Sequence, residues 1–125
     1  DLGGFDEDLQ ALVDWELMLR VAQRGPVALV DEPLVSQRFS DNSITRDQRR
    51  RVEARSYIVA KHADLIDCYR GALATQHYAL SGGFRGCGDL KRAAYHMTEA
   101  RKREPRRSKW ILMDAILRLR LAFRI

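Results

Sequence analysis

The side chains best suited to chemistry gather in the first sixteen residues of the chain. They are Gly3, Gly4, Phe5, Asp6, Glu7, Asp14 and Trp15. The two glycines permit backbone angles and close approaches that a side chain forbids. We expect Phe5 to anchor this loop by burial while the acidic pair after it stays in water. A glycine turn beside carboxylates is typical of the edge of an active site.

Asp14 is expected in the first turn of an amphipathic helix that stops at Gly25-Pro26. The apolar positions of this helix recur at helical spacing, namely Trp15, Met18, Leu19 and Ala22. Backbone N–H groups at a helix start stabilise an ionised carboxylate. Asp14 therefore fits a general base, and by residue type alone it fits a helix cap as well.

The order of several short motifs in residues 2 to 45 resembles the acceptor-side end of family-two glycosyltransferases. The motifs are Gly3-Gly4-Phe5-Asp6-Glu7, Asp14-Trp15-Glu16-Leu17, Leu19-Arg20, Gly25, Pro33-Leu34-Val35, Arg38 and Ser43. The resemblance implies a GT-A fold and inverting transfer from a nucleotide-sugar donor to the hydroxyl of a glycan or lipid-linked acceptor. It also implies Asp14 as the general base and a substrate site lined by Gly3, Gly4, Phe5, Asp6, Glu7, Trp15 and Arg38.

Three positions depart from the pattern of that family. Val13 replaces the usual Glu, Gln37 the usual aromatic residue, and Ser40 the usual His. The chain begins at Asp1, and the D-x-D motif through which such enzymes bind Mg²⁺ or Mn²⁺ belongs to a nucleotide-binding half that the matched motifs do not include. We therefore expect a fragment that binds no metal and is inactive alone, with the nucleotide-binding half upstream.

Each predicted contact residue also has a simpler interpretation. Trp15 either stacks on an acceptor sugar or belongs to the core, and Arg38 either faces the donor diphosphate or pairs with Glu32. The acidic corner of Asp6 and Glu7, continued by Asp8, either binds sugar hydroxyls or is solvated. The three histidines, His62, His77 and His96, have no metal-ligand spacing, so we expect them on helix surfaces or in grooves.

Charge is divided unevenly along the 125 residues, whose formal net charge is +5. Residues 1–45 hold three basic and nine acidic residues, whereas residues 46–125 hold 19 basic and eight acidic ones. A basic half suits an anionic surface. No apolar run is long enough to span a bilayer, and Cys68 and Cys87 fit two reduced thiols of a cytosolic protein.

The pattern along the chain predicts a mostly α (α+β) fold with two domains, 1–45 and 46–125. Two short strands are expected at 27–30 and 34–39. A long helix, or two nearly collinear ones broken near Gly71, follows over 46–80, after a cap at Thr45. A glycine-rich loop is expected at 81–88, then a helix capped by Asp89 and ended by Pro105, and a last helix from Ser108. The helices around the loop resemble one tetratricopeptide-like hairpin, taken as a packing appendage.

The basic segment 106–125 is the main alternative centre of function. As an interfacial helix it would place Trp110, Leu117, Leu121 and Phe123 in lipid, with Arg118, Arg120 and Arg124 on phosphates. As a packed helix it would keep only its arginines in water. Nucleic-acid binding is not favoured, because no zinc-finger, aromatic RNA-binding or recognition-helix motif is present.

These patterns leave two functional classes. The first is part of a glycosyltransferase of the cell-surface polysaccharide or glycolipid type, cytoplasmic or peripheral on the inner face of the membrane. The second is a non-catalytic basic helical adaptor or membrane-surface binding module.

Overall fold

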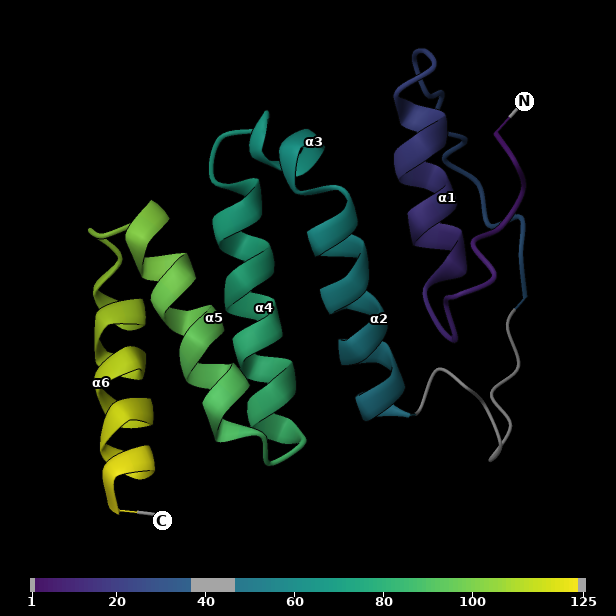
Figure 1. Cartoon of the computed structure of the whole chain (residues 1–125). Coiled ribbons are helices and arrows are strands. Elements are labelled where there is room, and N and C mark those ends of the chain that lie inside the picture. Colours follow the sequence, from purple (N-terminus) through teal and green to yellow (C-terminus); the bar gives the residue numbers. More distant parts are fainter. Residues whose placement is uncertain (1, 37–46, 124–125) are drawn as a thin grey trace.

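The computed structural model describes residues 2–36 and 47–123, and every regular element in these two segments is a helix. The elements are α1 (Val13–Ala22), α2 (Gln48–Lys61), α3 (Ala63–Asp67), α4 (Ala72–Gly86), α5 (Leu90–Arg103) and α6 (Ser108–Phe123). The five longer helices stand side by side in one row in the order α1, α2, α4, α5, α6, and short α3 turns the chain between α2 and α4 (Figure 1). From α2 onward the long helices alternate in direction.

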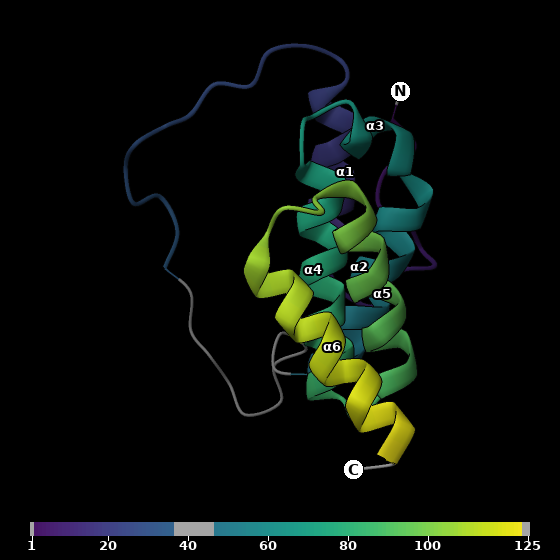
Figure 2. The same cartoon turned by 90° about the vertical axis from the view of Figure 1, so that its left-hand side faces the viewer.

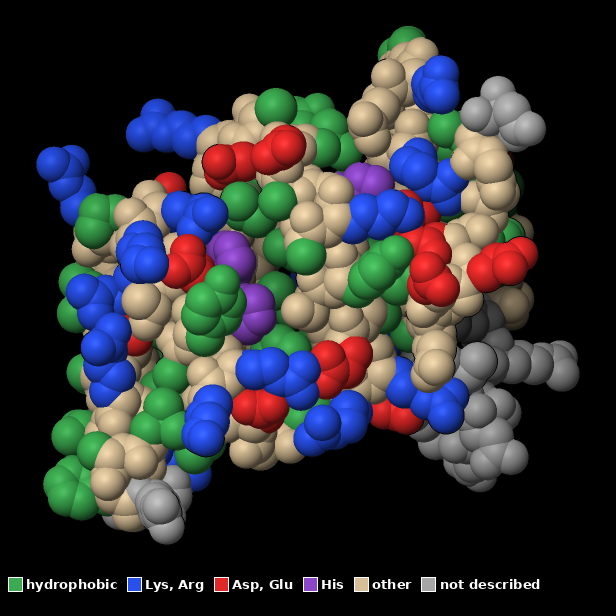
Figure 3. All heavy atoms as spheres, in the orientation of Figure 1, with side chains coloured by type: hydrophobic (Ala, Val, Ile, Leu, Met, Phe, Trp, Pro, Cys, Tyr) green, Lys and Arg blue, Asp and Glu red, His purple; other side chains and the backbone are tan. Residues whose placement is uncertain are grey.

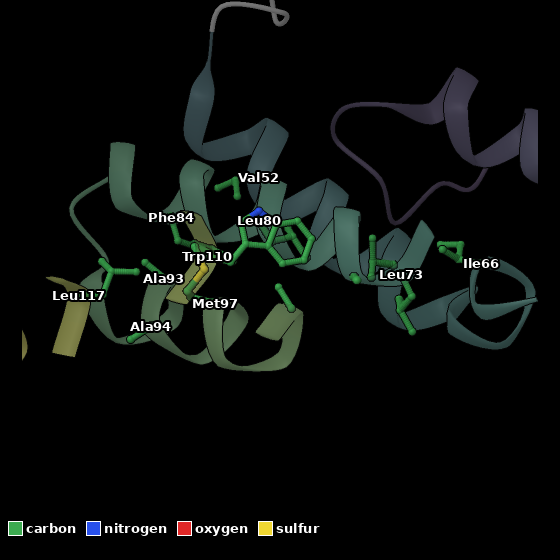
Figure 4. Packing of buried hydrophobic residues seen from close by; sticks show 13 residues of the cluster. Val52, Ile66, Leu73, Leu80, Phe84, Ala93, Ala94, Met97, Trp110 and Leu117 are labelled. Carbon is green, nitrogen blue, oxygen red and sulfur yellow. The ribbon is translucent and has the colours of Figure 1, made fainter. Parts of the chain in front are cut away.

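The core runs through the middle of this row, where α4 and α5 pack against each other (Figure 4). Its centre combines fully buried large side chains such as Phe84, Leu80 and Met97 with buried alanines on α5. Tyr78 of α4 stacks on Trp110 of α6 with ring centroids 5.0 Å apart. Small side chains on one helix against large ones on the other allow close packing.

The two predicted strands are wrong in the described residues. Residues 27–30 and 34–36 form no strand, and their side chains are exposed, with Leu29 at 91%. This segment extends beside the helices without packing on them (Figure 2). A strand needs a neighbouring strand for its backbone hydrogen bonds, and none stands beside it in the described part of the chain. The mostly α (α+β) class is therefore corrected to all-helical for these residues; positions 37–39 and Thr45 lie outside them.

For residues 46–80 the predicted break near Gly71 is confirmed, but one long helix and a collinear arrangement of two are both wrong. The chain reverses through α3 and Gly71, so α2 and α4 lie antiparallel and pack on each other. Gly71 takes a φ of 73°, which a residue with a side chain adopts only with strain. An apolar stripe at helical period faces a core equally well in one long helix or in two packed ones, so the periodicity alone did not reveal the reversal.

Most of the predicted loop at 81–88 is wrong, because residues 81–86 are the end of α4, which continues to Gly86. A Cβ atom at Gly83 would lie 2.6 Å from Val52 Cγ2, and one at Gly86 would collide with the Gln48 side chain. These glycines therefore sit where α4 crosses α2 most closely. The close approach, and not a turn, accounts for their presence, and only residues 87–89 connect α4 to α5.

The helices after this connection agree with the sequence prediction. The Asp89 side chain accepts a hydrogen bond from the Arg92 backbone N–H at 3.0 Å and caps α5. Helix α5 ends at Arg103, just before Pro105, and α6 begins at Ser108. Among the described residues no helix is both long and apolar enough to cross a membrane.

The glycines of α4 give a test of this packing. Gly83→Ala should destabilise the fold by about 1–3 kcal/mol, because the stiff Val52 side chain cannot move away from the added methyl group. Gly82→Ala is the matched control. Its Cβ would meet nothing within 4 Å, so the better helix propensity of Ala should stabilise the protein by about 0.5–1 kcal/mol. Urea unfolding followed by circular dichroism measures both, and equal effects of the two variants would contradict the close crossing.

Candidate functional site

Helix α1 is attached to the row through α2. Its first residue follows Leu12, which adopts a left-handed φ of 59° and lacks a side-chain cap. Leu9 and Ala11 of the preceding segment pack against Ala54 and Ile58 of α2. This second, smaller apolar cluster places the Gly-Gly-Phe loop and α1 along one side of α2.

The centre of this contact is a carboxylate that sequence reasoning did not single out. Glu16 of α1 has no solvent exposure. Arg20 donates to it from Nε at 2.9 Å and from a terminal nitrogen at 2.7 Å, while Lys61 Nζ and His62 Nε2 each lie 2.9 Å from Oε1. A buried charge is tolerated only when such donors replace the lost water.

The protonation of Glu16 follows from these opposing effects. Burial acts to raise the pKa of the carboxyl, but the hydrogen bonds from Arg20, Lys61 and His62 outweigh it and lower the pKa to about 2. Glu16 is therefore ionised at neutral pH and accepts hydrogen bonds only. His62 accordingly presents its Nε2 as the donor.

The same cations extend to the glycine loop. Arg20 also donates to the backbone carbonyls of Leu2 and, at 2.6 Å, of Gly4. Lys61 Nζ binds the Asp6 carboxylate at 2.7 Å, and Asp6 in turn accepts from the Asp8 backbone N–H at 3.0 Å. The hydrogen bond from Lys61 is the main reason that the pKa of Asp6 is lowered.

We call Asp6, Glu16, Arg20, Lys61 and His62 the Glu16 cluster. It ties the loop at residues 2–8 to α1 and to the end of α2. Gly3 and Gly4 take φ values of 73° and 75° in this loop, which confirms that left-handed backbone is needed there. The loop is thus shaped by polar contacts to its backbone and to one carboxylate.

Phe5 does not anchor the loop by burial as predicted, since 59% of it is exposed. Arg20 holds the loop by its carbonyls, so the ring is not needed inside. Glu7 is exposed too. Asp6, expected to remain in water, is instead partly covered and paired with Lys61.

Asp14 faces away from the Glu16 cluster. It is the second residue of α1, lies two positions before Glu16, and is exposed; residues two apart on a helix point to nearly opposite sides. Asp14 is not the cap, because Leu12 holds that position. Within 2–36 and 47–123 its side chain makes no hydrogen bond or ion pair. The structure thus presents Asp14 as an exposed carboxylate in the first turn of α1.

Trp15 lies on a third side of α1 and is half-buried. It packs against both hydrophobic clusters, and the Arg55 guanidinium carbon lies 5.2 Å from its ring centroid. Trp15 also lines a pocket of about 250 Å³ between α1, α3 and α4, together with Tyr69, Gln23 and Gln76. Trp15 therefore serves packing and also reaches an open pocket. Arg38 lies outside the described residues.

The histidine prediction missed one contact between helices. His77 of α4 and His96 of α5 meet with their Nδ1 atoms 3.0 Å apart. His96 is buried against Phe84, and burial, with the neighbouring His77 as a second cause, lowers its pKa to about 4. No group of three or more His, Cys, Asp or Glu side chains within the described ranges could hold a metal ion.

Part of the Glu16 cluster could have been predicted from the spacing of residues in the sequence. Glu16 and Arg20 stand four residues apart on a predicted helix, which indicates an ion pair. Lys61 and His62 come from a separate helix end, and nothing local marks them as partners.

Comparison of the chain with protein-family models, with curated proteins and with solved structures gave no match.

The pKa of Glu16 predicts an acid-sensitive fold. The pKa is lowered in the folded state from an ordinary 4.5 to about 2, so its stabilising contribution is complete above pH 4.5 and is lost as pH falls toward 2. Glu16→Gln should cost about 3 kcal/mol near neutral pH, and this difference from wild type should shrink below pH 4.5. Urea midpoints measured from pH 7 to pH 2 test it.

Glu7→Gln is the control for this measurement, because Glu7 is an exposed carboxylate in the same loop. It should change the midpoints little at any pH. A Glu16→Gln protein as stable as wild type at pH 7 would show that the buried carboxylate does not hold α1 in place.

Proposed function

We propose that this chain supplies the acceptor side of an inverting glycosyltransferase, with Asp14 as the general base. The observation that carries the proposal is the exposed carboxylate of Asp14 on a helix that the Glu16 cluster holds in place. A base must be unpaired and accessible to reach a proton, and its surroundings must be fixed to keep it in position. The all-helical fold of the described residues does not itself argue for this activity.

In the proposed reaction an acceptor hydroxyl gives its proton to an Asp14 carboxylate oxygen. The acceptor oxygen, which has lost that proton, attacks the anomeric carbon of the donor sugar as the bond from that carbon to the nucleoside diphosphate breaks. The donor-binding half, with the Mg²⁺ or Mn²⁺ that stabilises the leaving diphosphate in such enzymes, is placed upstream of these residues.

The loop and the pocket beside Trp15 are the proposed acceptor contacts. Gly3, Gly4, Phe5 and Glu7 are exposed on the loop, where backbone groups and a carboxylate suit sugar hydroxyls. The rings of Trp15 and Tyr69 and the amides of Gln23 and Gln76 line the pocket. Aromatic faces with a few polar groups suit a glycan or glycolipid.

The proposed setting is the cytoplasm, at the inner face of a membrane. Cys68 and Cys87 are both free, as expected in a reducing compartment.

A non-catalytic role as a basic helical adaptor is the second candidate function, and the basic side chains on the α6 side of the row favour it (Figure 3).

The proposal predicts a specific loss of turnover. In the full-length transferase, Asp14→Asn should reduce transfer by about a hundredfold or more and leave donor binding nearly unchanged. Asp64→Asn is the matched control, because Asp64 is likewise an exposed second residue of a helix, α3. If Asp14→Asn retained turnover within a few-fold of wild type, the assignment of the base would be wrong.

A second prediction concerns the binding of the sugar donor, which the proposal assigns to another part of the enzyme. Residues 1–125 alone should show no calorimetric binding of a uridine or guanosine diphosphate sugar, because the donor site is placed elsewhere. Micromolar binding to this chain would contradict that assignment.

A further inference from the structure

Helix α6 stands at the end of the row (Figure 1), where it packs on α5 and, through Trp110, on Tyr78 of α4. Trp110, Asp114 and Leu117 form the inner face of α6 and are buried. Trp110 and Leu117, predicted to enter lipid, are therefore core residues, and this prediction is corrected. Leu121 is also partly buried against the core.

The opposite face of α6 is apolar as well. We define the outer stripe as Ile111, Leu112, Ala115, Ile116, Leu119, Ala122 and Phe123. All seven are exposed, with Leu112 at 63% and Phe123 at 69%. On a helix that turns by about 100° per residue they cover a continuous sector of about 140°. Exposed apolar surface of this extent on one helix marks a contact site.

Basic residues border the outer stripe on both sides. Lys109 and Arg120 follow one edge and Arg118 follows the other, while Arg107 lies just before the helix with its guanidinium over Trp110; all four are exposed. The single acidic residue of α6, Asp114, is on the inner face and is held by Arg101 and Arg118. The exposed surface of α6 thus combines apolar and cationic side chains without a carboxylate.

Charge is also distributed unequally along the row of helices, with the α6 end basic and the α1 end acidic. Residues 101–123 hold eight basic and two acidic residues, whereas residues 2–36, at the α1 end of the row, hold two basic and seven acidic ones. Hydrophobic and basic side chains share the edge over α6, at the left of Figure 3. An anionic surface would therefore attract the α6 end and repel the α1 end.

We propose that the outer stripe of α6 lies in the interface of an anionic lipid membrane. The apolar stripe enters the boundary between headgroups and acyl chains, and the cations on both borders meet lipid phosphates. When the apolar sector is immersed, the cations along both of its edges lie at the level of the lipid phosphates on either side of the helix. This inference does not rest on the glycosyltransferase proposal, and it leaves α1 at the far end of the row from the membrane.

Vesicle co-sedimentation of the 125-residue chain tests the proposal. Vesicles of phosphatidylcholine with phosphatidylserine should bind the protein, and vesicles of phosphatidylcholine alone should bind it far less. Binding should weaken between about 0.15 M and about 1 M salt, where the Debye length falls from about 8 to about 3 Å. No sugar donor is needed, so failure here is distinct from failure of the transferase proposal.

Two variants separate the stripe from its borders. Leu112→Ser with Leu119→Ser should weaken binding at least tenfold by removing apolar contact. Lys109→Gln with Arg120→Gln should weaken it about tenfold or more and reduce the preference for anionic lipid, since each basic contact contributes about fivefold. Circular dichroism confirms that each variant keeps its helices.

The controls carry the same changes away from α6. Leu29→Ser with Leu34→Ser alters two exposed leucines near α1, and Arg24→Gln with Arg70→Gln removes two exposed charges elsewhere. Both should bind like wild type. The proposal is overturned if wild type does not sediment with anionic vesicles, or if the controls lose as much as the α6 variants. It is also overturned if the outer stripe instead drives self-association in solution without any vesicle binding.

Discussion

The burial of one carboxylate decides how the first third of the chain is attached to the rest. Glu16 has lost all contact with water, and that cost is tolerable only because Arg20, Lys61 and His62 donate to it together. Two of these donors also reach the glycine loop. The same contacts therefore fix the position of α1 and the shape of the loop, and a change to Arg20 or Lys61 disturbs both.

A second buried carboxylate attaches the helix at the opposite end of the row. Asp114 of α6 is fully buried and is bonded by Arg101 and Thr98 of α5 and by Arg118 of its own helix. The apolar core is concentrated on α4 and α5. The two outermost helices thus combine modest apolar contacts with one satisfied buried charge each, which makes their docking geometry specific as well as favourable.

The sequence predicted local features well and long-range ones poorly. Asp89 as a cap, Pro105 as a stop and the start of α6 depend on a few neighbouring residues, and all three were predicted correctly. The reversal of the chain before α4 and the helical conformation of Gly83 depend on the position of α2. A short stretch of sequence does not contain that information. Apolar residues 27–30 satisfied the strand pattern, yet a strand also requires a partner. For the candidate site, the sequence was enough to predict Asp14 in the first turn of a helix. The burial of Glu16 could not be predicted in this way, because its partners Lys61 and His62 come from another helix.

The single-file arrangement of the helices has a consequence for motion. Each inner helix is held by neighbours on both sides, but α1 and α6 are held on one side only (Figure 1). Detaching an end helix leaves the α4–α5 pair intact, so the cheapest openings of this protein begin at its two ends and move inward. Amide protons in the middle of α4 and α5 should then exchange with solvent last. The proposed acceptor site and the proposed membrane contact are at the two ends, where opening is cheapest, and the α4–α5 pair, which rarely opens, separates them.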